Sequence, residues 1–309
     1  MNLSIDTKSI ISISANTGWR EKVGHIKIRL GIGRFRYRVE PGVYSVGTPK
    51  PDSPVLVTAN YKLTFDLLRG NLAGIDAWIL VLDTKGINVW CAAGKGTFST
   101  DEIVKRIADF DLKKIVNHKE LIVPQLGAPG VSAHEVQRQS GFKVIYGPVR
   151  ASDIKRFLDN DKKVDSEMKD VTFTTFERLI LTPLEVTELL KPFTIWILLG
   201  IFLISGISPQ LFSPEPAFLG LAAMCVALFI GIFLGAFITP ILLPWIPGRS
   251  FAWKGFIIAS IVAWFLFPII HARTDFLSAL SLCLAAVTIS SFSAMNFTGS
   301  TPFTSPSGV

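Results

Sequence analysis

The chain changes character near Lys191, and this change constrains its fold more than any other feature. Beyond it lie long apolar runs with few charges, of the length that crosses a lipid bilayer. We expect four transmembrane helices, at about 193–207, 217–239, 256–270 and 276–295. Before Lys191, apolar segments of strand length alternate with amphipathic ones. The sequence therefore predicts an α/β domain followed by an α-helical transmembrane domain.

Charge predicts the orientation. The loop at 208–216 has no Lys or Arg, whereas the loop at 240–255 carries Arg249 and Lys254, so the second loop is expected inside. The net charge of +7 is concentrated before Lys191, as in a cytoplasmic domain beside an anionic leaflet. Nucleic acid is not an expected partner, because no basic-aromatic motif accompanies the charge. The N-terminus lacks the features of a signal peptide. We expect a multi-pass protein of the cytoplasmic (inner) membrane.

Composition shifts divide the chain into five parts. These are a basic N-terminal segment with a hairpin, an α/β domain, a charged linker with interfacial helices, the transmembrane domain and a polar tail: 1–50, 51–158, 159–191, 192–296 and 297–309. The tail ends without a terminating feature, so truncation is expected there. Alternating residues at 26–30 and 34–39 predict the hairpin, turning at Gly31–Gly33.

The α/β domain is expected to hold a mostly parallel, Rossmann-like sheet, because its strands alternate with helices. The expected strands are 55–58, 77–83, 121–123 and 142–146. The expected helices are 62–69, 100–110, 132–139 and 153–158. Ser99 or Thr100 and Ser132 are the expected N-caps of two of these helices.

The stretch Asn88–Lys95 follows the second of these strands and contains Cys91. In open α/β sheets, ligands bind where strands end. The residues after the cysteine, Ala92, Ala93 and Gly94, are small, so a flat group could approach the backbone.

Several chemistries compete for Cys91. A phosphate-binding loop fails on spacing, since Val89 stands where its first glycine belongs and Gly96 follows Lys95. A redox dithiol fails because no second cysteine is near. A Cys–His nucleophile would need His118 or His134 as its base. A structural, buried cysteine also remains open.

A metal ligand is the remaining alternative, because a thiolate at a helix N-terminus has a lowered pKa. The other cysteines, Cys225 and Cys283, lie in apolar runs, and no C-x-x-C pair exists. Iron–sulfur clusters and cysteine-rich zinc sites are therefore excluded. A single protein ligand suits a cofactor that brings its own macrocycle, such as haem or a corrinoid.

The same stretch carries a resemblance. Asn88–Lys95 resembles the signature of the mercury-methylating corrinoid proteins (the HgcA family), as does the tail segment Met295–Ser300. Val55–Tyr61 resembles the corrinoid iron–sulfur protein of the acetyl-CoA pathway. The resemblance spans about residues 45–309, and family members carry one further span after the tail.

The resemblance implies a corrinoid-binding domain in which Cys91 is the lower axial ligand of cobalt, the chain's metal ligand and catalytic residue. The motif D-x-H-x-x-G of cobalamin-dependent mutases is absent, which agrees with a cysteine rather than a histidine ligand. A thiolate would favour release of the methyl group as a carbanion equivalent to Hg(II), giving methylmercury; the alternative is a methyl carrier of one-carbon metabolism. The expected cofactor contacts are Thr58, Asn60, Asn88, Val89, Trp90, Cys91, Ala92, Ala93, Gly94, Lys95, Gln125, Gly127, Gly130 and Gly147.

The resemblance also implies partners. A ferredoxin-like 4Fe-4S protein (HgcB type) would reduce the cobalt, since this chain has no cluster of its own. Hg(II) would be the acceptor, and the methyl group would come from a methyltransferase or a methyl-tetrahydrofolate system. Membrane lipid would surround the apolar helices.

Overall fold

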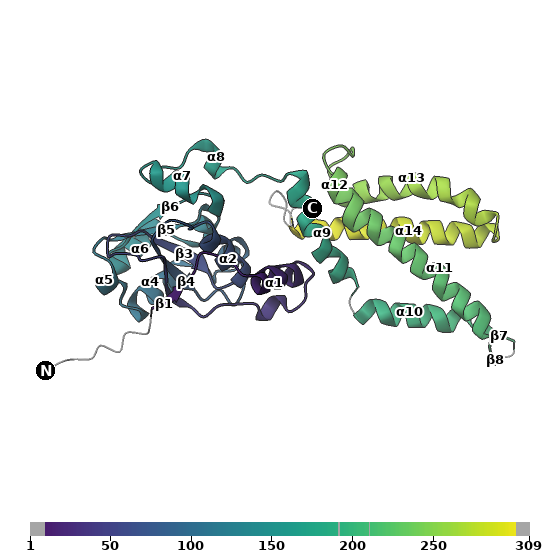
Figure 1. The fold of residues 1–309 in the computed structure, drawn as a ribbon. Coiled ribbons are helices and arrows are strands. Elements are labelled where there is room, and N and C mark those ends of the chain that lie inside the picture. The colour runs from purple at the N-terminus through teal and green to yellow at the C-terminus, as the bar shows by residue number, and fades with distance from the viewer. Residues whose placement is uncertain (1–9, 191, 210, 301–309) are drawn as a thin grey trace. The chain divides into compact units, whose positions relative to one another are not determined.

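The computed structural model describes residues 10–300 except 191 and 210, and they form two compact units (Figure 1). The first, the α/β unit, holds the described residues up to Ile28 and those from Ile32 to Val171. The second, the helical unit, holds Arg29–Gly31 and the described residues from Thr172 on. Most of the tail expected to be truncated, 301–309, lies outside the described residues.

The α/β unit is built on a six-stranded sheet in the order β1-β2-β4-β3-β5-β6. All neighbouring strands are parallel except β2 and β4. The strands are β1 (Ile11–Ile13), β2 (Gly42–Val46), β3 (Val55–Ala59), β4 (Ala77–Leu82), β5 (Glu120–Val123) and β6 (Lys143–Tyr146). The central strands β3 and β4 are buried on both faces, as expected of parallel strands covered by helices. The mostly parallel α/β sheet is confirmed.

Helices cover both faces of the sheet (Figure 1). One core cluster joins the sheet to α3 (Val89–Gly94), α4 (Thr100–Asp109), α5 (Leu112–Ile115) and α6 (Ala133–Ser140). The other joins it to α2 (Lys62–Gly70), α7 (Ile154–Asp159) and α8 (Ser166–Lys169). Ser99 and Ser132 cap α4 and α6 through their hydroxyl oxygens, as predicted.

The hairpin expected at residues 26–39 is wrong. The structure has helix α1 (Trp19–Arg29) and a short 3₁₀ turn at Arg34–Arg36 in its place. The apolar residues Ile26, Ile28 and Leu30 alternate, but Ile26 also continues a helical spacing that begins at Trp19 and Val23. Strands β1 and β2 were not predicted, although β2 pairs antiparallel with β4 and is wholly buried.

The helical unit contains three helices long and apolar enough to cross a membrane: Pro214–Leu242, Phe251–His271 and Phe276–Asn296. The first is continuous through α11 (Pro214–Ile232), a π-helical segment (Phe233–Ile238) and α12 (Thr239–Leu242). The other two are α13 and α14. The first of the four expected spans corresponds to α10 (Pro192–Ser205), a shorter apolar helix.

Small residues let these helices approach closely, as is common between membrane helices. A Cβ placed on Gly235 would lie 2.2 Å from the carbonyl oxygen of Ser290. The hydroxyl of Ser290 donates to the carbonyl oxygen of Gly255 at 3.0 Å, which ties α14 to α13. The unit also holds α9 (Thr175–Leu189), a strand pair, β7 (Ile207–Ser208) with β8 (Leu211–Phe212), and a 3₁₀ turn at Phe297–Ser300.

Candidate functional site

The site lies where the strand order of the α/β unit reverses. Strand β4 flanks β3 on one side and β5 flanks it on the other, so the chain crosses over β3 on its way from β4 to β5. Ligands of open α/β sheets bind in the crevice that such a reversal leaves at the carboxyl ends of the strands. Here that crevice is a pocket of about 320 Å³.

The pocket is mostly apolar, and parts of the unit that are far apart in sequence line it. Strands β3 and β5 supply its floor, α2 and the segment after β6 supply walls, and the start of α3 supplies the rim. Its lining residues are Leu56, Val57, Thr58, Thr64, Leu67, Leu68, Asn88, Val89, Trp90, Ile122, Pro124, Leu126, Gly147, Pro148, Val149, Arg150, Ala151 and Ile154.

Cys91 lies in the first turn of α3, whose start is fixed by Asn88. The side-chain oxygen of Asn88 accepts a hydrogen bond from the backbone N–H of Cys91 at 2.9 Å, so Asn88 is the N-cap. The stretch between β4 and α4 therefore contains a short helix of its own, which was not among the expected helices. Asn88 acts on the cysteine through the backbone and also lines the pocket.

Helix α3 has a buried and an exposed face. Val89, Ala92 and Ala93 point into the core, with Ala92 fully buried. The two alanines are thus small because they pack beneath the helix, and the expectation that they contact a flat ligand does not fit this placement.

The exposed face of α3 carries Trp90, Cys91 and Gly94. Trp90 is 39% exposed and lines the pocket. Gly94 follows Cys91 by about one helical turn, and a Cβ placed on it would meet no atom within 4 Å. The sulfur therefore stands beside a flat, open stretch of backbone. The alternative of a buried, structural Cys91 is excluded.

The 125–130 segment that follows β5 holds α3 in place. A Cβ on Gly130 would lie 2.1 Å from the carbonyl oxygen of Phe98 and 3.0 Å from the Cα of Ala93. A Cβ on Gly127 would lie 2.5 Å from the ring of Phe98. Both glycines are thus explained by close packing against Phe98, which follows the cysteine helix, and Gly130 also by its approach to Ala93 within that helix.

Asn60 joins the loops after β3 and β4. Its amide nitrogen donates to the carboxylate of Asp83 at 3.1 Å. Its amide oxygen accepts from the backbone N–H and the hydroxyl of Thr84 and from the N–H of Gly86, the last at 2.9 Å. The amide oxygen and the amide nitrogen are thus both engaged within the protein, so Asn60 holds together the two loops beside the crevice.

The remaining expected residues fall into two groups. Thr58 and Gly147 line the pocket, and Gly147 allows close packing, since its Cβ would lie 2.9 Å from a methyl carbon of Ile122. Gln125 and Lys95 are not among the lining residues; Lys95 is exposed at the end of α3.

Two polar lining residues, Thr64 and Arg150, were not predicted. Arg150 follows β6, so the rule that strand ends meet at one edge could have found it. Thr64 lies within α2, and no local pattern distinguishes it from other helical residues.

The donor set suits a metal that arrives inside a macrocycle. Among the described residues, no group of three His, Cys, Asp or Glu side chains could hold a metal ion. One exposed thiol beside a flat helix face, next to a largely apolar pocket, matches a flat cofactor that needs a single axial ligand. The residues present therefore fit a corrinoid.

Comparisons with known proteins place the α/β unit. A family model described as CO dehydrogenase/acetyl-CoA synthase delta subunit matches residues 33–158. Acetyl-CoA decarbonylase/synthase complex subunit gamma of Archaeoglobus fulgidus is 33% identical over 130 residues, 41% of this chain and 27% of that protein. The subunit gamma of Methanopyrus kandleri is 35% identical over 125 residues, 40% of this chain and 27% of that protein.

The chain thus spans about a quarter of the length of these curated relatives. Their matches support the relation to the acetyl-CoA pathway that Val55–Tyr61 predicted. The α/β unit is therefore related to the CO dehydrogenase/acetyl-CoA synthase proteins of the acetyl-CoA pathway.

Proposed function

We propose that the chain is a membrane-attached, corrinoid-dependent methyl-transfer protein in which Cys91 would hold the cobalt through its sulfur. The observation that carries the proposal is the exposed thiol of Cys91 on α3, beside the open Gly94 and next in sequence to Trp90, which lines the pocket where the strand order reverses. The relation of residues 33–158 to acetyl-CoA pathway proteins supports it.

The proposal gives a role to each residue of the site that the structure places at or near the pocket. A bound corrinoid supplies a cobalt centre that takes up a methyl group and gives it up again. Cys91 would hold this metal through its sulfur, and Asn88 fixes the start of the helix that carries the sulfur. Trp90 would cover one edge of the site. Thr58 and Gly147, at the ends of β3 and β6, lie where the cofactor's polar periphery could be bound.

The methyl acceptor favoured by the comparisons is one of one-carbon metabolism. The relatives are subunits of the acetyl-CoA decarbonylase/synthase complex. By analogy, this chain would carry methyl groups from a methyltransferase or methyl-tetrahydrofolate system to a partner protein.

Hg(II) is the second candidate acceptor, and the sequence of α3 favours it. The stretch Asn88–Lys95 resembles the mercury-methylating proteins, and the structure makes its cysteine accessible. A thiolate donates more electron density than an imidazole, so Cys91 would favour departure of the methyl group with its electron pair. An electrophile such as Hg(II) requires this polarity. The product would be methylmercury.

Two further proposals concern the surroundings. A ferredoxin-like 4Fe-4S partner would return the cobalt to its reduced state, since the chain's three cysteines cannot bind a cluster of this kind. The three long apolar helices support a multi-pass protein of the cytoplasmic membrane with the α/β unit on the cytoplasmic side.

The test uses the full chain purified in detergent and reconstituted with methylcobalamin. The protein is offered Hg(II) or, separately, an acetyl-CoA decarbonylase/synthase preparation without its own corrinoid subunits. Transfer to either acceptor that is lost in Cys91→Ala and kept in Cys225→Ala supports the proposal, and the acceptor that reacts identifies the function. Cys225 is the matched control, since it is exposed but lies on α11. Equal transfer by Cys91→Ala would refute the axial-thiolate role.

Cys91→His tests the polarity argument separately. Imidazole can also bind cobalt, so this variant is expected to keep the corrinoid absorbance. It is expected to lose most of the transfer to Hg(II), because imidazole donates less electron density than a thiolate. Undiminished transfer by this variant would contradict the argument.

A further inference from the structure

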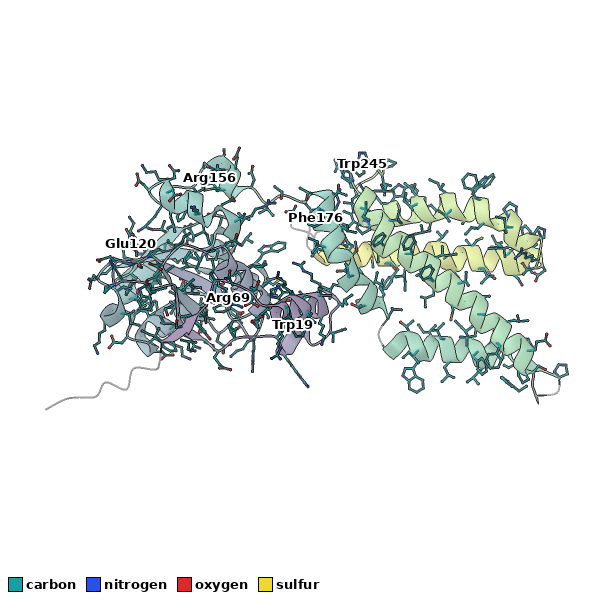
Figure 2. All side chains as sticks on the ribbon, viewed as in Figure 1. Trp19, Arg69, Glu120, Arg156, Phe176 and Trp245 are labelled. Atoms are coloured by element: carbon teal, nitrogen blue, oxygen red, sulfur yellow. The ribbon has the colours of Figure 1, made fainter. Side chains whose placement is uncertain are left out.

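Helix α1 presents its apolar face outward. Trp19, Val23 and Ile26 follow one another at helical spacing, and Leu30 continues the row directly after the helix. Trp19 is 71% exposed and Ile26 59% exposed, although both belong to the most hydrophobic residue types. Figure 2 labels Trp19 on this helix. These four residues are called the α1 stripe below.

The opposite face of α1 is polar and is anchored to α2. The ring nitrogen Nε2 of His25 lies 2.8 Å from the carboxylate of Asp66, and Glu21 lies 3.6 Å from the guanidinium of Arg69. Ile28 completes this face and is buried. Because His25 is hydrogen-bonded to Asp66 and Glu21 pairs with Arg69, the helix cannot turn its apolar face inward without breaking these contacts with α2. The exposure of the stripe is therefore fixed by the fold.

Basic residues flank the α1 stripe on both sides. At about 100° per residue, Arg20 and Lys27 project to one side of the stripe, and Lys22 and Arg29 project to the other. Glu21, the helix's acidic residue, lies on the inward face with Arg69. An apolar stripe with a tryptophan, bordered by lysines and arginines, is the pattern of a helix that lies in the plane of a membrane interface.

The position of α1 in the chain supports a lipid partner over a protein partner. The same chain carries three helices able to cross a membrane. Once those helices are inserted, their covalent link to α1 keeps the membrane surface at an effective concentration that no soluble partner has.

We infer that α1 is an interfacial helix, which inserts Trp19, Val23, Ile26 and Leu30 into the bilayer surface and binds anionic lipid headgroups through its flanking lysines and arginines. The inference rests on insertion of the three long helices but not on corrinoid chemistry. Such a contact holds one edge of the α/β unit on the membrane.

The test is site-directed spin labelling of the full chain, with its three native cysteines replaced by serine, in bilayers of phosphatidylcholine and phosphatidylglycerol. One nitroxide at a time is placed at Ile26→Cys, at Gln137→Cys or at Trp264→Cys. Gln137 is exposed on α6 and serves as the aqueous reference. Trp264 is 79% exposed on α13 and serves as the lipid reference. Collisions with oxygen and with a water-soluble nickel chelate are measured at each site.

The label at Ile26 is expected to behave like that at Trp264, with frequent oxygen collisions and few nickel collisions. If the label at Ile26 collides with nickel as often as the label at Gln137 while the label at Trp264 stays in lipid, α1 is not interfacial. The exposed α1 stripe would then be a binding surface for a protein. If the label at Trp264 also meets nickel freely, the helices are not inserted, and both the membrane assignment and this inference fail.

A charge-reversal pair tests the headgroup contact. Lys22→Glu with Lys27→Glu should increase nickel collisions at Ile26 in the anionic bilayer, because repulsion lifts the helix from the surface. Lys143→Glu with Lys155→Glu makes the same charge change at exposed positions on β6 and α7 and should leave the collisions unchanged. Equal effects of the two pairs would contradict a specific contact of α1 with anionic lipid.

Discussion

Asp66 is central to the contacts between helices α1 and α2. Its side chain is wholly buried and meets three basic residues: His25 at 2.8 Å, Lys62 at 2.8 Å and Arg69 at 2.8 Å. Burial alone raises the pKa of this carboxyl, but the hydrogen bonds from Lys62, His25 and Arg69 outweigh burial and hold the pKa below its usual value. The carboxylate therefore stays charged and paired at neutral pH.

Replacing Asp66 is expected to destabilise the α/β unit. Asp66→Asn leaves buried cations without their counter-charge, so the free energy of unfolding should fall by about 3–5 kcal/mol. Denaturant unfolding of the full chain in detergent, followed by tryptophan fluorescence, measures the change. Asp101→Asn, at an exposed carboxylate on α4, is the control and should change little. A loss at Asp66 no larger than that at Asp101 would contradict this role.

The same carboxylate predicts a dependence on pH. Because the pKa of Asp66 is lower in the folded than in the unfolded chain, its stabilising contribution is complete above the unfolded pKa of about 4. The contribution is lost as the pH falls from there through the folded pKa. Unfolding measured between neutral and acidic pH should thus show an acid-induced loss of stability that is smaller in Asp66→Asn. If the free energy of unfolding falls equally with acidification in both proteins, Asp66 is not the cause of the acid-induced loss of stability.

At the scale of elements, the candidate site depends on the packing of α3 against the 125–130 segment. Their contact is close because Gly130 has no side chain. Gly130→Ala should force the segment away from Phe98 and Ala93, cost about 1–3 kcal/mol of stability and reduce corrinoid binding. Unfolding and binding titrations of the same preparation measure both effects. Unchanged stability would show that the segment can shift without cost.

Gly94, on helix α3, differs from Gly130 because there is space for a side chain beside it. Its Cβ would meet no atom, so Gly94→Ala should keep or raise the stability of the protein without cofactor, by up to about 1 kcal/mol. If the cofactor lies against this face beside Cys91, the new methyl group should weaken corrinoid binding. A variant that is as stable as the natural protein and binds corrinoid equally well would place the cofactor elsewhere.

Local patterns predicted most of the α/β elements. Strands β3 to β6 and helices α2, α4 and α6 were predicted because their apolar periodicity and capping serines are contained in short windows, whereas the short helices α3 and α5 were not. The strand β2 was not predicted, because it pairs antiparallel with β4 across more than thirty residues and interrupts a basic segment. The hairpin was wrong because the alternating Ile26, Ile28 and Leu30 fit two periodicities. The helix is stabilised by tertiary contacts of its residues His25 and Glu21 with Asp66 and Arg69 on α2.

The candidate site was predicted to a similar degree. Asn88 and Trp90 were predicted from their place after a strand end, and both line the pocket, whereas the role of Cys91 stays a prediction. Asn60, Gly127 and Gly130 were assigned to the ligand, whereas the structure engages them in contacts within the protein. Thr64 and Arg150 were missed because their approach to the pocket depends on how α2 and β6 cross the sheet.

At the scale of the whole molecule, the sidedness of the helical unit can be tested. The positive-inside rule places the loop before α13 in the cytoplasm, since it carries Arg249 and Lys254. Helix α10 has 14 residues and is about 21 Å long, short of the roughly 30 Å of a hydrocarbon core. The four-span arrangement therefore needs α10 to cross with help from its flanking residues or a locally thinner bilayer.

Labelling single cysteines in sealed inverted and right-side-out vesicles decides the sidedness. In a chain without its native cysteines, Ser250→Cys should react with a membrane-impermeant maleimide only from the cytoplasmic side. Thr274→Cys, between α13 and α14, should react only from the outer side. The reverse pattern would place the α/β unit outside if α10 crosses the membrane. Alternatively, it would mean that α10 does not cross.

The central claim is that Cys91 binds the cobalt of a corrinoid, and cobalt K-edge X-ray absorption of the reconstituted full chain tests it most directly. The account predicts one sulfur neighbour of cobalt in the natural protein and in Cys225→Ala. It predicts no sulfur neighbour in Cys91→Ala, even where that variant retains some corrinoid. Cobalt bound without a sulfur neighbour in the natural protein would contradict the account, and so would a sulfur signal that survives the loss of Cys91.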